Sequence, residues 1–465
     1  MTEVSLVEKS RSHLPLMVLL FCGGALLLFS LWSPNAALVK GGGLALIIIA
    51  LFVTARIPEY ITVLIFFSLA TLFQVAPTEV VFSGFQSAAL WLVFSGLVVG
   101  VAMQITGLGK RIASYLAGYL EGSYFRLISG VVLVGLLLAF VMPSAMGRIL
   151  LLIPVTLALA DHFGFEPGSN GRTGLVMAVT LGTFIPAFTI LPANVVNMIL
   201  VGMAESQYNF SPLFGEYLLL LFPVLGLLKS GFIIALVLWF YPDQPQVVDK
   251  SDVHHNRVLS KDARILAAVL ALLLLFWMTD FIHHISPAWI GLAGAVYLLL
   301  PRVGVVHGDQ FNREVDYAPL FVVAGVIGLG GVIHYAGVGG VMNSYLITHL
   351  PLDPETPFIN YLSVAVIATL TGVVTTLPGI PAVVTPLTGD IAAATGFSPP
   401  AVLMMQMVGV SSILFPYQAP PLLVALQLTG VKLQSMFRLI LILALASYLV
   451  FIPLNYLWWQ MLGWI

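Results

Sequence analysis

The chain has 465 residues, of which 60% are hydrophobic and 8% are charged, and its mean hydropathy is +1.05. Soluble domains carry roughly three times that share of charge, so the composition excludes a soluble protein and indicates a bundle of membrane-spanning helices. The net charge of −2 says little about partners, and no basic patch or nucleic-acid-binding motif is present. The single cysteine, Cys22, excludes an internal disulfide and offers no metal-ligand spacing.

The first apolar run covers residues 14–32 and follows Lys9 and Arg11. It is long for a signal peptide and no Ala-x-Ala cleavage site follows, so we expect a retained first helix within an N-terminal segment 1–39. Further apolar segments lie near residues 43–55, 60–76, 85–107, 126–160, 173–203, 213–241, 263–281, 288–301, 318–341, 360–396, 398–426 and 434–460. The aromatic C-terminus, with Trp458 and Trp459, is typical of an interfacial belt.

Two of these segments, 126–160 and 360–396, are about twice the roughly 20 residues that a transmembrane helix needs. Pro143 lies at the middle of the first, and Pro378 and Pro381 lie at the middle of the second. Each segment is therefore either two crossings or a re-entrant hairpin. Proline at the turn favours the hairpin, because the freed backbone groups can then face a polar cavity.

The distribution of positive charge supports the hairpins. With both hairpins re-entrant and the N-terminus in the cytoplasm, the other segments make eleven crossings. Fifteen of the 18 Lys and Arg residues then lie on the cytoplasmic side, as the positive-inside rule requires. This topology opens the first hairpin to the cytoplasm and the second to the exterior, and places the C-terminus outside.

A long internal repeat relates the two halves of the chain. Residues 93–109 resemble residues 323–339, Pro154 corresponds to Pro386, and Pro192 corresponds to Pro420. The offset stays between 228 and 232 residues over more than 100 residues. We therefore expect an all-α integral membrane protein with about eleven transmembrane helices, two re-entrant hairpins and two inverted repeats, 40–241 and 263–465, joined by a cytoplasmic linker, 242–262.

Several motifs resemble those of the divalent anion/sodium symporter (DASS) family of the ion transporter superfamily. They are Gly-Leu-Gly-Lys-Arg-Ile-Ala at 107–113, a serine at the first hairpin turn, Leu-Leu-Ile-Pro-Val at 151–155 and Phe-Pro-Tyr-Gln-Ala-Pro-Pro at 415–421. The resemblance implies inverted repeats, two helices broken at the bilayer midplane, and a homodimer in which a transport domain moves against a scaffold. It also implies transport of a dicarboxylate, citrate or sulfate, often with sodium, across a bacterial inner membrane.

The resemblance also implies the site. The family carries Ser-Asn-Thr at both hairpin tips, where this chain has Ser144-Ala145-Met146 and Thr376-Leu377-Pro378. Sodium sites would lie near Ser144 and Ile190, and near Thr376 and Gln418, but both tip asparagines are replaced, which leaves sodium coupling and the dicarboxylate substrate open. No other cofactor is expected. The tips and the two helix breaks supply the predicted substrate contacts, which are Ser144, Ala145, Met146, Arg148, Leu191, Pro192, Asn194, Thr375, Thr376, Pro378, Gly379, Gln418, Ala419 and Pro420.

Two cations are predicted within the membrane. Arg148 lies 13 residues before Asp161, hence roughly 20 Å deep. It is either a fixed cation that binds an anionic substrate as a bidentate fork and replaces a sodium ion, or a structural residue paired to carbonyls or a carboxylate. Lys229 is either functional or extends its ammonium toward the membrane surface.

The leading hypothesis is an elevator-type secondary transporter of a small anion, sodium-independent and driven by exchange or by protons. A cation/proton antiporter or a metalloid exporter would need a carboxylate at midplane. We expect the candidate carboxylates to lie elsewhere: Glu59, Glu79, Asp280, Asp316 and Asp390. A membrane enzyme is disfavoured because the sequence shows no catalytic motif, and a non-transporting sensor stays open. The run Gly96-x-x-x-Gly100 and the glycines at 325–331 indicate close helix packing.

Overall fold

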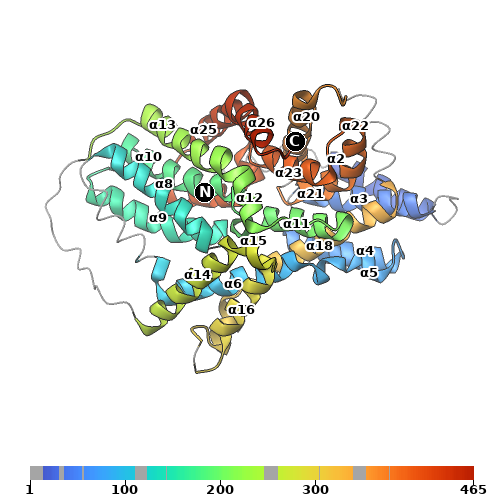
Figure 1. Ribbon diagram of the computed structural model, residues 1–465, viewed down its shortest axis with the longest axis horizontal. Helices are drawn as coiled ribbons and strands as arrows, with labels where there is room; N and C mark the ends of the chain where they lie inside the picture. Colours follow the sequence, from blue (N-terminus) through green and yellow to red (C-terminus); the bar gives the residue numbers. More distant parts are fainter. Residues whose placement is uncertain are drawn as a thin grey trace.

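The computed structural model describes residues 14–30, 36–54, 57–109, 111, 123–142, 144–245, 260–302, 304–338, 352–375 and 377–465. Within these residues the regular elements are helices (Figure 1). Eight of the described helices are long and apolar enough to cross a bilayer, or nine if a helix pair bent by 117° between Gly379 and Val410 counts as one span. The expected all-α membrane fold is confirmed.

The helices of the first half are, in chain order, α2 (Leu14–Phe29), α3 (Ala36–Thr54), α4 (Glu59–Leu72), α5 (Thr78–Val81), α6 (Ala88–Thr106), α8 (Tyr124–Val141), α9 (Ala145–His162), α10 (Asn170–Phe184), α11 (Val195–Tyr208), α12 (Phe214–Leu221) and α13 (Lys229–Phe240). Those of the second half are α14 (Lys261–Met278), α15 (Asp280–His283), α16 (Pro287–Leu299), α17 (Gly308–Glu314), α18 (Ala318–Tyr335), α20 (Pro357–Val374), α21 (Gly379–Val384), α22 (Thr388–Thr395), α23 (Pro399–Val410), α24 (Pro420–Thr429), α25 (Leu433–Ala446) and α26 (Ile452–Met461).

The order of elements repeats. In the first half, α8 ends at Val141 and α9 begins at Ala145, and a helix that breaks between α10 and α11 follows. In the second half, α20 ends at Val374 and α21 begins at Gly379, and a helix breaks between α23 and α24. Each half then ends in a long helix interrupted by a π-helical turn, η4 (Phe222–Leu228) or η7 (Ser447–Phe451). Since α8 and α9 are each 18 residues long, either could also cross a bilayer, so the re-entrant geometry stays a prediction.

The two halves pack against each other through matching contacts. Helix α9 contacts α24, and its counterpart α21 contacts α11. Likewise α10 contacts α24, while its counterpart α23 contacts α11. Two copies related by a two-fold axis exchange contacts in this way. Figure 1 shows the result as teal and green helices of the first half interleaved with orange and red helices of the second.

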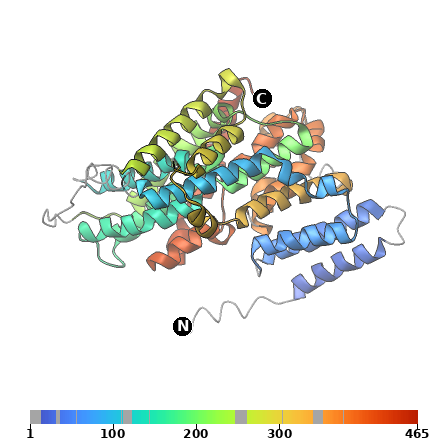
Figure 2. The ribbon, with the colours of Figure 1, turned by 90° about the horizontal axis from the view of Figure 1, so that it is seen from below.

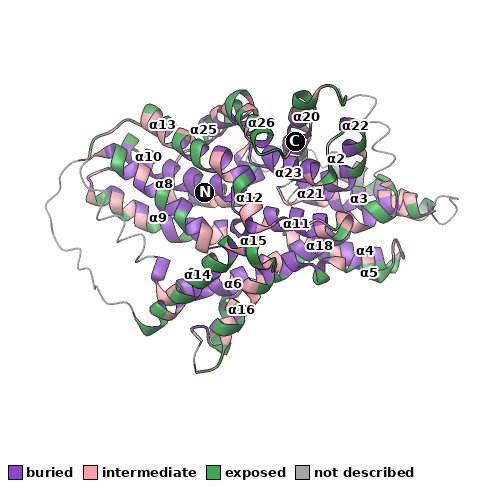
Figure 3. Ribbon diagram, in the orientation of Figure 1, coloured by how far each residue is buried: buried purple, intermediate pink, exposed green. Residues whose placement is uncertain are grey.

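The broken helices form the centre of the bundle. In an 18-residue window of the span Asn170–Thr189, 89% of residues are buried, against 39% in α20 and in a window of the C-terminal span. Figure 3 shows buried residues along α11, α18 and α23. Helices α2 and α3 pack side by side as an outer layer (Figure 2). The centre of the bundle is therefore the place to look for a site.

Close packing fixes α18 against its neighbours. A Cβ on Gly325 would lie 2.0 Å from the side chain of Val63, and one on Gly328 would lie 2.2 Å from the carbonyl oxygen of Val81. These glycines let α18 approach α4 and α5, as the sequence indicated.

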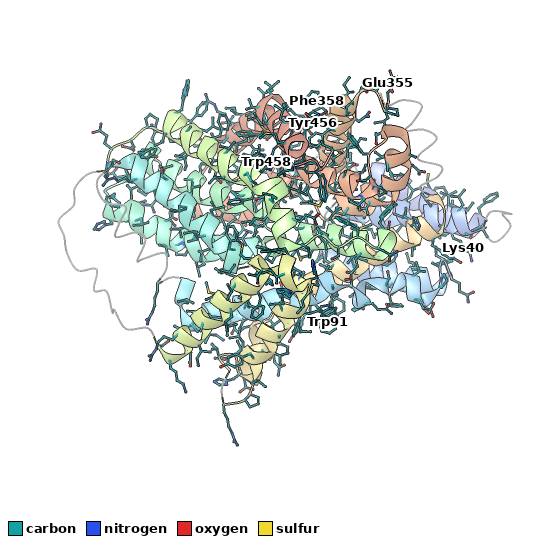
Figure 4. All side chains as sticks on the ribbon, in the orientation of Figure 1. Lys40, Trp91, Glu355, Phe358, Tyr456 and Trp458 are labelled. Atoms are coloured by element: carbon teal, nitrogen blue, oxygen red, sulfur yellow. The ribbon has the colours of Figure 1, made fainter. Side chains whose placement is uncertain are left out.

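Two C-terminal tryptophans donate hydrogen bonds to backbone carbonyls that lie at the break between α12 and α13. Pro223 has no N–H to donate to the carbonyl of Leu219, four residues earlier. The indole of Trp458 donates to that carbonyl at 2.8 Å, and the indole of Trp459 donates to the carbonyl of Leu220 at 2.8 Å. Figure 4 labels Trp458 on α26. The prediction of an interfacial belt is wrong for Trp459, which is fully buried.

Candidate functional site

A cavity of about 500 Å³ lies where both helix turns meet both helix breaks. Its wall includes Met146 from the first turn of α9 and Leu377, which precedes α21. It also includes Asn194 at the start of α11 and Pro421 at the start of α24. This volume is that of a typical small-molecule site.

The structure brings many of the predicted contact residues to this wall. They are Ser144, Ala145, Met146, Asn194, Pro378, Gln418, Ala419 and Pro420. They come from four segments that are far apart in sequence, so the repeat-related segments converge on one space. Ile190, predicted near a sodium site, is buried beside the first break.

The other predicted residues lie off this wall. Leu191 and Gly379 are buried in the bundle, and Pro192 lines an adjoining pocket of about 40 Å³. The hydroxyl of Thr375 donates to the carbonyl of Thr371 at 2.8 Å, one helical turn earlier. Thr376 lies outside the described residues.

Two helix N-termini make the first-half side of the cavity favourable for an anion. Ser144 caps α9, because its hydroxyl oxygen accepts the N–H of Gly147 at 3.0 Å. Asn194 caps α11, because its Oδ1 accepts the N–H of Val196 at 3.4 Å. Helix N-termini carry partial positive charge and unpaired N–H groups, so an anion at this end of the cavity would be stabilised by both.

Asn194 also carries an unused donor. Its side chain is 7% exposed, and its amide nitrogen, Nδ2, has no hydrogen-bond partner among the described residues. A buried amide without a partner costs free energy. Asn194 lies on the cavity wall, but Nδ2 itself is buried, so a rotation of the side chain would bring this donor to an anion bound in the cavity.

The second break contributes differently. The side-chain oxygen of Gln418 accepts the N–H groups of Leu414 and Phe415, both at 2.8 Å, and so holds the loop before α24. Helix α24 begins with Pro420 and Pro421, neither of which has an N–H. The N-terminus of α24 therefore offers its dipole to the cavity but no donor from its first two residues.

Arg148 is not among the residues that line the cavity, and its contact with substrate stays a prediction. It is fully buried, and its guanidinium donates to the carbonyls of Met142, Ala193 (3.0 Å) and Thr183 (3.5 Å). These carbonyls belong to the end of α8, the first break and the last turn of α10. These contacts are the carbonyl pairing named in the second of the predicted alternatives, and they join the end of α8 to the first break.

Some cavity residues were missed or misinterpreted from the sequence. Gly96 and Gly100 line the cavity, and a Cβ on Gly100 would meet no atom within 4 Å. The prediction that Gly100 serves helix packing is therefore wrong. Three carboxylates, Glu59, Glu314 and Asp316, also lie on the wall, although Glu59 and Asp316 were expected elsewhere. Glu314 and Asp316 are exposed and Glu59 is half-buried, so these carboxylates lie where the cavity wall meets the surface.

Comparison with known proteins decides the family. The family model of the sodium:sulfate symporter transmembrane region matches residues 14–465. The chain belongs to the sodium:sulfate symporter family. Membership in this family makes the protein an integral membrane transporter of anions. Its bacterial relatives support a location in the inner membrane. The resemblance to the DASS family is confirmed.

Individual relatives of this symporter-family protein are distant. A membrane protein of Cupriavidus necator is 25% identical over 409 residues, which cover 82% of this chain and 77% of the relative. An L-tartrate/succinate antiporter of Escherichia coli is 25% identical over 271 residues, so the match spans 55% of this chain and 54% of the antiporter. The crystal structure of the Alcanivorax borkumensis YdaH transporter has a TM-score of 0.55 at 18% identity, covering 83% of this chain and 88% of that one. That likeness supports the fold alone.

Proposed function

We propose that this protein is a secondary active transporter that binds a small carboxylate, sulfate or similar anion in the 500 Å³ cavity. One observation carries the proposal: the N-termini of α9 and α11 face the same cavity, with the unpartnered amide of Asn194 beside them. This arrangement offers hydrogen-bond donors and positive dipole ends before any ligand arrives. The antiporter of Escherichia coli, whose name states L-tartrate and succinate, makes carboxylates the first anions to test.

The packing favours an elevator-type cycle. Both turns and both breaks are joined through the contacts of α9 with α24 and of α21 with α11. A unit joined in this way would move as one body, with the anion inside it, against the outer helices. The outer helices would then form the scaffold and the homodimer contact.

Sodium independence is a further part of the proposal. The guanidinium of Arg148 already satisfies the carbonyls of Met142, Thr183 and Ala193. A permanent charge at these oxygens leaves no reason for a dissolved cation to bind there. Exchange or proton coupling would then drive the cycle, and uptake that strictly requires an inward sodium gradient would contradict this part.

The test uses two glycines that differ only in location. Gly100 lies on the cavity wall and Gly231 lies on the exposed face of α13, and a Cβ on either meets no atom within 4 Å. We expect Gly100→Leu to fill the cavity and to abolish anion uptake into proteoliposomes. Gly231→Leu should transport normally. Normal uptake by Gly100→Leu, with the protein folded, would place the transported anion elsewhere.

Cation/proton antiport is a second candidate, favoured by the carboxylates of Glu59, Glu314 and Asp316 on the wall. It predicts that a pH gradient drives cation flux without any anion. The measurement is cation uptake into anion-free proteoliposomes, compared with the triple Gln/Gln/Asn variant at these positions.

A further inference from the structure

Lys229 is a second buried cation with no counter-charge. It lies after the π-helical turn η4, at the middle of the span Phe214–Phe240, and is 1% exposed. Its Nζ donates to the carbonyl of Ser411 at 2.9 Å. The expectation that its ammonium extends to the membrane surface is therefore wrong. Among the described residues, the one ion pair joins Arg172 to Asp161. No described carboxylate therefore pairs with Lys229.

The acceptor of Lys229 is related by the internal repeat to an acceptor of Arg148. An offset of 228 residues carries Pro192 to Pro420, and the same offset carries Thr183 to Ser411. Thr183 is in the last turn of α10, and Ser411 is the C-cap residue of α23. The carbonyl of each accepts a hydrogen bond from a buried cation. The cations themselves are unrelated by the repeat, because one comes from α9 and the other from α13.

The C-terminal ends of α10 and α23 both need a partner for their backbone carbonyls. The C-terminal end of a helix carries partial negative charge and unpaired carbonyls, and away from water these need a cation or a donor. Each end also holds a buried hydroxyl without a hydrogen-bond partner, on Thr183 in one half and on Ser412 in the other. Carbonyl and hydroxyl oxygens at an interrupted helix form a suitable ligand set for a small monovalent cation.

We infer that the end of α23 is a cation-binding site that the side-chain nitrogen of Lys229 occupies. The protein thus supplies from its own side chains a nitrogen donor for each broken helix, from Arg148 in one half and Lys229 in the other. The transport consequence, a cycle that needs no dissolved cation at the second break, rests on the proposed function. The binding claim does not.

The experiment measures the melting temperature of the purified full chain without any substrate, in sodium, potassium, ammonium or choline chloride at equal ionic strength. Lys229→Ala removes the ammonium and leaves space for a small cation, whereas Lys229→Met fills that space with an apolar side chain. We expect the melting temperature of Lys229→Ala to rise by several degrees, saturably, when a small cation replaces choline. The unaltered protein and Lys229→Met should show no such difference.

Two results would overturn the inference. One is a Lys229→Ala variant whose response to the four salts equals that of the unaltered protein. The other is a Lys229→Ala variant that folds in none of them, because a dissolved cation then does not replace the ammonium. A separate measurement of anion uptake distinguishes failure of this inference from failure of the proposed function. If the unaltered protein takes up no anion, the proposed function fails, while the salt dependence of melting still decides the inference.

Discussion

Asn194→Asp is the sharpest test of the anion site, because it changes charge and donor while keeping shape. Asp is as good an N-cap as Asn, so the hydrogen bond from the N–H of Val196 and the start of α11 should survive. Stability should therefore change by no more than about 1 kcal/mol. The unpartnered amide donor, however, is replaced by a carboxylate at the place where the substrate anion would lie.

The magnitude follows from the lost interaction. A hydrogen bond to a charged group contributes about 1.5–3 kcal/mol, which corresponds to roughly 10–150-fold in affinity. Repulsion between two anions in a partly enclosed cavity adds to this loss. Asn194→Ser keeps a capping oxygen and loses the amide without adding charge, so its affinity should fall by about the hydrogen-bond term alone.

The assay has two stages. A thermal-shift screen of the unaltered protein against succinate, L-tartrate, sulfate and monocarboxylates identifies a stabilising anion. Titration of that anion against the unaltered protein, Asn194→Ser and Asn194→Asp then gives three dissociation constants, in that expected order of increasing value. Equal affinities for the unaltered protein and Asn194→Asp would refute the assignment of the anion to the N-terminus of α11.

Two further predictions concern the framework around the site. Arg148→Met leaves the carbonyls of Met142 and Ala193 without a hydrogen-bond donor. At about 1–3 kcal/mol per buried group, the free energy of unfolding in detergent should fall by about 2–6 kcal/mol. An unchanged denaturation midpoint would contradict the structural role. Trp459→Phe removes the donor to the carbonyl of Leu220 and should lower the melting temperature. The control, Trp239→Phe, lies at a position that is 81% exposed and should leave the melting temperature unchanged. Equal effects of the two substitutions would contradict the packing of α26 on α12.

Much of the fold followed from the chain itself. Proline at the centre of long apolar segments predicted the interruptions between α8 and α9 and between α20 and α21, and the offset between Pro192 and Pro420 predicted two matching helix breaks. These features are local, since a missing N–H acts on its own helix. The meeting of turns and breaks on one cavity also followed once the repeat was recognised.

The partners of the buried cations did not follow from the sequence. An intramembrane arginine signals a demand for acceptors but not which acceptors. Whether Arg148 met a ligand or three carbonyls depended on the approach of α10 to α9. Lys229 finds its acceptor 182 residues away, across the interface between the two halves. Gly100 was misassigned because small residues serve both close packing and the opening of a cavity, and the sequence pattern is the same.

The measurement closest to the central claim compares charged thiol reagents at the two turns. In a Cys22→Ser background, Met146→Cys and Pro378→Cys each place one thiol on the cavity wall. A membrane-impermeant sulfonate reagent and an ammonium reagent are compared, with rates normalised to a free thiol. If the turns share an anion-attracting cavity, the sulfonate reagent should be favoured at both positions, and the stabilising anion should slow both reactions. Preference for the ammonium reagent, or reaction at only one turn, would contradict the account.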